Sequence, residues 1–93
     1  MGQTSRVSGR ATSVFEDGGY TCVRYHQTVV IKWNDKEIVL NSGGWRTVTT
    51  KTRINQASNQ YGLGVGVYQR DGEWRVTFKG DNLAFSDGMV LTR

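Results

Sequence analysis

Cys22 and His26 carry the only thiol and the only imidazole in the sequence, and such a pair can act as a nucleophile and its base. Residues 20–25 are rich in aromatic and β-branched side chains, which predicts a strand. Along a strand, four residues span about 13 Å, whereas a catalytic pair needs a separation of roughly 3 Å. We therefore interpret Cys22 as a packed residue and His26 as a surface or capping residue.

The sequence also contains no motif typical of a metal site or of acid–base catalysis. A zinc site needs about four ligands, which one cysteine and one histidine cannot supply. The acidic residues stand at predicted turns, such as Glu16 with Asp17 and Asp71 with Glu73, where turn chemistry explains them. The glycines in residues 62–66 match neither a P-loop nor a dinucleotide fingerprint. The sequence therefore predicts no enzyme, no metal and no cofactor.

The positive charge of the chain is confined to one segment. Twelve lysines and arginines against eight acidic residues give a net charge of +4. No acidic residue lies between Glu37 and Asp71, and this segment contains four basic residues: Arg46, Lys51, Arg53 and Arg70. Because the remaining eight basic residues balance the eight acidic ones, the whole excess belongs to residues 38–70.

Short apolar runs separated by turn residues predict strands on both sides of this segment. Residues 11–16, 20–25, 28–33 and 37–40 form the first group, with Val29, Ile31 and Trp33 expected on one face. After Gly62, alternating residues such as Trp74, Val76 and Phe78 predict a second group. The predicted fold class is α+β: a small antiparallel sheet or partial barrel of short strands with one helix over one side.

Residues 47–61 lack the alternation of a strand and predict the one helix. Thr50, Ile54, Ala57 and Tyr61 would form a narrow stripe on it, at spacings of four, three and four. Gly62 suits the position just after a helix, where a left-handed conformation is common.

The rest of this helix is polar, basic and free of acidic residues. Together with the preceding turn it provides the candidate binding residues Trp45, Arg46, Lys51, Arg53, Asn55, Gln56 and Asn59. Lysine and arginine bind phosphates, and asparagine and glutamine can read adenine edges. An exposed Trp–Arg pair could stack on a base or anchor a protein interface. The same face suits nucleic acid, an acidic protein or plain solvent, and all three interpretations stay open.

The turn at residues 42–47 admits two interpretations. Free backbone N–H groups before a helix, with Arg46 beside them, could hold an anion. We favour an ordinary strand-to-helix turn in which Thr47 is the N-cap.

Ninety-three residues fit one domain, residues 1–93, and residues 1–9 are expected to form a loose N-terminal arm. One cysteine, no secretory signal and no apolar run of about 18 residues predict a cytoplasmic protein that does not contact membranes. A domain this small has a thin stability margin, which self-association into a homo-oligomer would increase.

The block at residues 40–56, LNSGGWRTVTTKTRINQ, resembles a group of small phage-encoded proteins. The similarity extends through residues 61–64 and 74–76, and so spans roughly residues 25–90. The resemblance implies a phage or prophage product that works inside a bacterial host, and it implies no particular fold or activity.

These observations support three hypotheses. The first is a nonenzymatic binding module that contacts nucleic acid through the basic helix and the turn before it. The second is an inhibitor that uses the same face against an acidic host protein. The third is a minor virion or assembly component, which would form oligomers and copurify with particles.

Overall fold

A computed structural model describes residues 11–44 and 46–93. The predicted arm at residues 1–9 and Trp45 lie outside the described residues. The described elements follow one another as β1 (Thr12–Asp17), β2 (Tyr20–Tyr25), β3 (Thr28–Trp33), β4 (Glu37–Leu40), α1 (Val48–Tyr61), β5 (Val65–Arg70), β6 (Glu73–Phe78), β7 (Asp81–Ala84) and β8 (Met89–Thr92). The predicted α+β class is confirmed.

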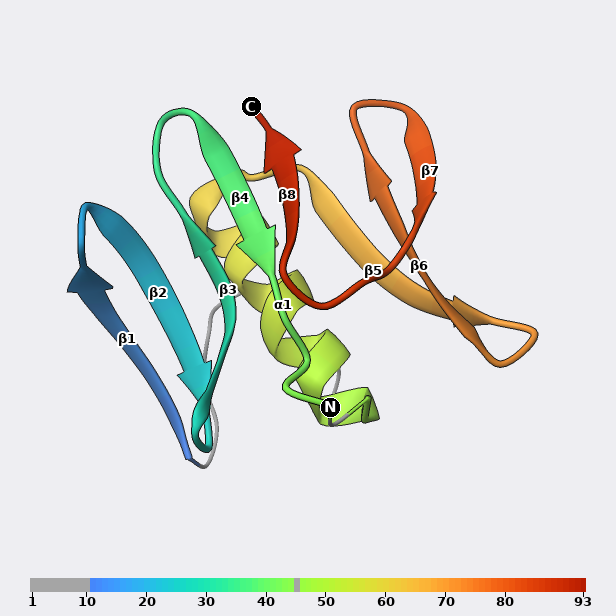
Figure 1. Cartoon of the computed structure of the whole chain (residues 1–93), viewed down its shortest axis with the longest axis horizontal. Helices are drawn as coiled ribbons and strands as arrows, with labels where there is room; N and C mark the ends of the chain where they lie inside the picture. The colour runs from blue at the N-terminus through green and yellow to red at the C-terminus, as the bar shows by residue number, and fades with distance from the viewer. Residues whose placement is uncertain (1–10, 45) are drawn as a thin grey trace.

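The strands form two antiparallel sheets, both open at their edges (Figure 1). The larger sheet has the order β1-β2-β3-β4-β8, so the last strand returns to lie beside β4. The smaller sheet has the order β5-β6-β7. The prediction of a small antiparallel sheet or partial barrel with one helix is thus confirmed in its class, with two antiparallel sheets that do not close among the described residues. Helix α1 packs against β2, β3 and β5, and so connects the two sheets.

A β-bulge in β3 changes which side chains of this strand face the core. The register between β2 and β3 shifts so that Arg24 lies opposite Val29 and Val30 is left over. Val30 and Ile31 are both buried, at 1% and 0% exposed. The expectation that Val29, Ile31 and Trp33 share one face is therefore wrong at Val29, because the bulge shifts the alternation by one residue.

Helix α1 begins and ends at residues that satisfy its terminal backbone groups. The Thr47 hydroxyl accepts a hydrogen bond from the Thr50 backbone N–H at 3.2 Å, as expected of an N-cap. At the other end, Gly62 adopts the left-handed conformation with φ of 65° and donates its N–H to the Ser58 carbonyl. The predicted range 47–61 thus matches the observed helix with Thr47 as its cap.

One cluster of buried apolar side chains lies between the helix and both sheets. Thr50, Ile54 and Ala57 are buried, as the predicted stripe requires. Tyr61, the fourth residue of the predicted stripe, is 39% exposed, although the centre of its ring lies 4.8 Å from that of Trp33. The described members of the cluster are Val23, Val30, Ile31, Trp33, Ile38, Leu40, Ile54, Ala57, Leu63, Val65, Val67, Trp74, Val76, Phe78, Phe85 and Leu91.

Two side chains of α1 hydrogen-bond to the backbone of β5, at the edge of the smaller sheet. The Asn55 amide donates to the Val67 carbonyl at 3.0 Å and accepts from the Val67 N–H at 2.9 Å. The Ser58 hydroxyl accepts from the Val65 N–H at 2.8 Å. These side chains take the place of a neighbouring strand, because a β-strand edge otherwise leaves such groups unpaired.

The substitution Asn55→Ala should destabilise the protein, because it leaves the Val67 N–H and carbonyl without their partner. We expect the free energy of unfolding to fall by about 1–3 kcal/mol, measured by urea denaturation. The matched control is Asn59→Ala, at an exposed position on the same helix, which should change stability by about 0.5 kcal/mol or less. Equal effects of the two substitutions would show that the Asn55–Val67 pairing does not stabilise the fold.

Candidate binding surface around the helix

The turn between β4 and α1 already holds a carboxylate from elsewhere in the chain. The backbone N–H and the hydroxyl of Ser42 both donate to Oδ1 of Asp87, at 2.8 and 2.6 Å. The Gly43 N–H donates to the Asn41 side chain at 2.7 Å, and the Gly44 N–H to the Ser42 hydroxyl at 3.2 Å. The N–H groups of Ser42, Gly43 and Gly44 are therefore engaged within the described part of the protein, and Thr47 is the N-cap.

Three influences act on the ionisation of Asp87. Burial disfavours the charged carboxylate, but the two hydrogen bonds from Ser42 and the positive charge of Arg46 favour it. The net result is that the pKa of the Asp87 carboxyl lies below its ordinary value. Arg46 therefore acts electrostatically on a carboxylate that follows β7, far away in the sequence.

Arg46 and Lys51 lie together on one flank of α1, beside the smaller sheet. The Arg46 guanidinium is 5.2 Å from the ring centre of Phe85 and 5.9 Å from that of Trp74. The Lys51 ammonium is 5.5 Å from the Trp74 ring centre and donates a hydrogen bond of 3.4 Å to the Gln69 side chain. Cations near aromatic faces are attracted by the ring quadrupole. The rings themselves are buried, so the flank presents its charges and hides its aromatic surface.

Arg53 lies on the opposite flank, beside the larger sheet. Its Nε donates to the Thr12 hydroxyl at 2.9 Å and its Nη1 to the Gln56 side chain at 3.3 Å. The guanidinium is 5.7 Å from the ring centre of Tyr25. Since Lys51 and Arg53 are two positions apart, their side chains leave the helix about 200° from one another.

The predicted site residues therefore separate into groups with different environments. The structure brings Arg46 together with Lys51, and Arg53 together with Gln56, which is buried at 5% exposed. Asn55 is engaged with β5, and Asn59 is exposed. Trp45 lies outside the described residues. Between the flanks, the outward side of the helix carries uncharged side chains, including Val48 at 70% exposed.

The fourth basic residue of the positive segment, Arg70, lies away from this surface. It stands at the end of β5, directly opposite Glu73 in the hairpin with β6. A cross-strand pair of opposite charges compensates part of the local field. Sequence reasoning missed this local pairing across the hairpin turn. It also missed the position of Asp87, which depends on how distant segments of the chain meet.

Cys22 lies within β2, and His26 lies in the turn that follows this strand. Cys22 is 3% exposed within β2, and its burial raises the pKa of the thiol. His26 occupies the β2–β3 hairpin turn with φ of 57°, and its ring contacts that of Tyr25. Among residues 11–44 and 46–93, no three His, Cys, Asp or Glu residues come close enough to form a metal site. In that same part of the chain, no helix is both long and apolar enough to span a bilayer.

The low pKa of Asp87 predicts a dependence of stability on pH. A carboxyl whose pKa is lower in the folded protein than in the unfolded chain stabilises the fold at any pH above the unfolded pKa, which is about 4. This stabilisation is lost as the pH falls through the pKa of the folded protein. The variant Asp87→Asn should therefore be less stable than the wild type at pH 7, and should lose less stability between about pH 5 and pH 2. Urea denaturation at several pH values measures this.

The control for Asp87→Asn is Asp71→Asn, which makes the same change of charge in the exposed β5–β6 turn and tolerates the positive φ of 53° there. It should leave the pH dependence unchanged. An Asp87→Asn variant with the pH dependence of the wild type would show that the Ser42–Asp87 contact does not contribute to acid sensitivity.

Comparison with known proteins assigns the chain to a family. The family model described as Kyanoviridae Gp96 protein matches residues 2–92. No curated protein and no solved structure matches the chain. The match agrees with the resemblance to phage-encoded proteins, although it does not single out the block at residues 40–56. Since it covers nearly the whole sequence, the chain belongs to the Kyanoviridae Gp96 protein family, a family of phage proteins.

Proposed function

We propose that this phage protein is a nonenzymatic binding module that contacts nucleic acid through the outward side of α1, in the cytoplasm of the host. The observation that carries the proposal is the arrangement of charge around the helix. Lys51 lies on one flank and Arg53 on the other, and helix α1 itself contains no acidic residue.

A helix with cations on both flanks suits a groove of a nucleic acid. Phosphate backbones border such a groove on each side, and the outward side of the helix faces the base edges between them. Thr52 and Asn59 are polar and uncharged, and Val48 supplies an exposed apolar contact at the start of the helix. Such side chains can meet base edges without the cost of desolvating a charge.

The contacts of the cations with the protein restrain their positions without neutralising them. Lys51 is held by the Trp74 ring and the Gln69 amide, and Arg53 by the Tyr25 ring, the Thr12 hydroxyl and the Gln56 amide. All of these partners are uncharged, so both positive charges are available to phosphates. Arg46 adds a third cation, although it acts electrostatically on Asp87.

The affinity for duplex DNA should decrease with salt to an extent set by these cations. Two or three phosphate contacts predict a log–log slope of about −2 to −3. The variant Lys51→Gln/Arg53→Gln removes both flanking charges while it keeps long polar side chains, and should reduce the magnitude of the slope by about 1.8. Fluorescence anisotropy with short labelled duplex and single-stranded DNA and RNA, at several salt concentrations, measures this.

The matched control is Arg24→Gln. Arg24 is exposed and lies on the face of the larger sheet opposite to the buried Val23, and therefore away from α1. This variant should bind with nearly the wild-type slope. If the wild-type protein fails to bind any of these nucleic acids even at low salt, or if both variants weaken binding equally, α1 is not a nucleic-acid contact.

A further inference from the structure

A pocket of about 650 Å³ opens at the end of the molecule where α1 terminates, and neither the helix surface nor the proposed nucleic-acid contact uses it. Four segments that are distant in sequence meet there: the β3–β4 turn, the α1–β5 connection, the β6–β7 turn and the end of the described chain (Figure 1). Its lining residues are Asp35, Leu63, Gly64, Phe78, Lys79 and Arg93. The volume lies within the range of ordinary ligand pockets.

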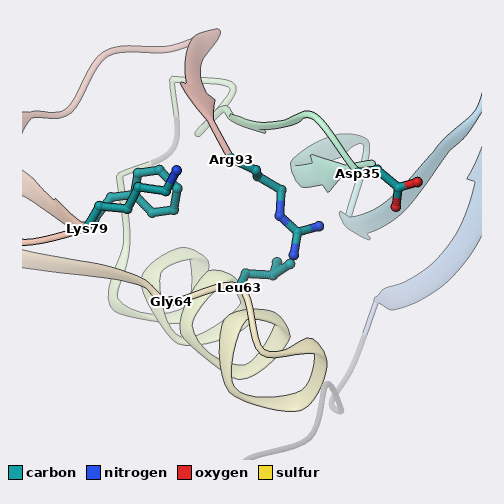
Figure 2. A pocket seen from close by; sticks show the side chains of 6 residues that line it. Asp35, Leu63, Gly64, Lys79 and Arg93 are labelled. Atoms are coloured by element: carbon teal, nitrogen blue, oxygen red, sulfur yellow. The ribbon is translucent and has the colours of Figure 1, made fainter.

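Two cations border this pocket above an apolar base. In Figure 2 the Arg93 side chain lies between those of Lys79 and Asp35, and its guanidinium extends toward Leu63. Leu63 and Phe78 supply the apolar surface, and both are largely buried at 5% and 8% exposed. The pocket therefore combines positive charge with the small apolar surface that these two side chains leave exposed.

Neighbouring groups hold the two cations at the opening. The Lys79 ammonium is 5.4 Å from the Phe78 ring centre, and the Arg93 Nη1 donates to the Asn34 carbonyl at 2.8 Å. The Arg93 backbone N–H donates to the Lys36 carbonyl at 2.9 Å, which attaches the end of β8 to the β3–β4 turn. The charged groups are thus partly ordered before a ligand arrives, which lowers the entropic cost of binding.

We propose that this pocket binds an acidic peptide segment of a partner protein. The carboxylates of the segment contact Lys79 and Arg93, and an apolar side chain next to them packs on Leu63 and Phe78. The backbone of Gly64, which has a φ of 72°, borders open space at this point of the lining. The inference does not rest on the proposed nucleic-acid contact, since the two surfaces share no residue.

The acidic side chain among the described lining residues, that of Asp35, favours a peptide over a nucleic acid. Asp35 lies at the rim, and in Figure 2 its carboxylate points away from both cations. A continuous row of phosphates would pass close to this carboxylate and be repelled by it. A peptide instead has backbone N–H groups that can donate hydrogen bonds to the Asp35 carboxylate, together with isolated carboxylates that can contact Lys79 and Arg93.

The test uses the whole protein and the capped peptide Glu-Phe-Glu-Leu-Glu, followed by NMR of the backbone amides. We expect saturable shifts at Gly64 and Lys79, and no saturable shifts with the matched peptide Lys-Phe-Lys-Leu-Lys. The variant Lys79→Met keeps the apolar stem and removes the charge, so it should weaken binding by about fivefold, the effect of one exposed ion pair. The control Arg24→Gln removes a charge outside the pocket and should bind as the wild type does.

Three results would overturn the proposal. The first is the absence of saturable shifts at Gly64 and Lys79, and the second is equal binding of the acidic and basic peptides. In the third, a DNA duplex shifts the same two amides and Lys79→Met abolishes the effect, which would assign the pocket to nucleic acid. Loss of DNA binding in Lys51→Gln/Arg53→Gln leaves the peptide result unaffected, so the failures of the two proposals can be distinguished.

Discussion

The contact between helix α1 and the edge of β5 holds the two halves of this protein together. Asn55 and Ser58 satisfy backbone groups of Val67 and Val65, and the buried side of the helix packs against β2 and β3 as well. Without this contact, one edge of the smaller sheet would carry unpaired donors and acceptors. The apolar cluster that includes side chains from both sheets would also lose the element that joins them.

The same contact determines which polar side chains of the helix are engaged with β5 and which remain available to a binding partner. Residues at positions 51, 55 and 58 lie along one side of α1 and meet residues 69, 67 and 65 of β5 in turn. Asn55 therefore stabilises the contact between α1 and β5, whereas the charged group of Lys51, at the end of this row, remains at the surface. Arg53 leaves the helix on the other side, so the polar helix surface has one cation on each flank.

Turns gather near both ends of helix α1, and the charged side chains at the two ends differ. Near the start of α1, the Asp87 carboxylate accepts hydrogen bonds from the N–H and the hydroxyl of Ser42. Its negative charge also offsets part of the positive charge of Arg46. At the other end, Lys79 and Arg93 border a pocket that also contains apolar surface. For a phage protein of this size, separate surfaces for nucleic acid and for a peptide would allow one chain to connect two partners.

Local patterns in the sequence determined the class of the fold, the positions of most strands and the limits of the helix. Capping at Thr47, the left-handed Gly62 and the spacing of Thr50, Ile54 and Ala57 depend on neighbours within a few residues, so they can be read without a structure. The same is true of the confinement of positive charge to residues 38–70. The bulge at Val30 escaped prediction because it depends on the pairing of two strands.

Only the tertiary structure decided what the charged residues do. Arg46, Lys51 and Arg53 lie within eight residues of one another, yet Arg46 acts electrostatically on Asp87, whereas Lys51 and Arg53 lie beside uncharged partners. The pocket with Lys79 and Arg93 likewise forms from four distant segments. Local sequence carries no record of such meetings, because electrostatic interactions depend on distance in space and not on separation along the chain.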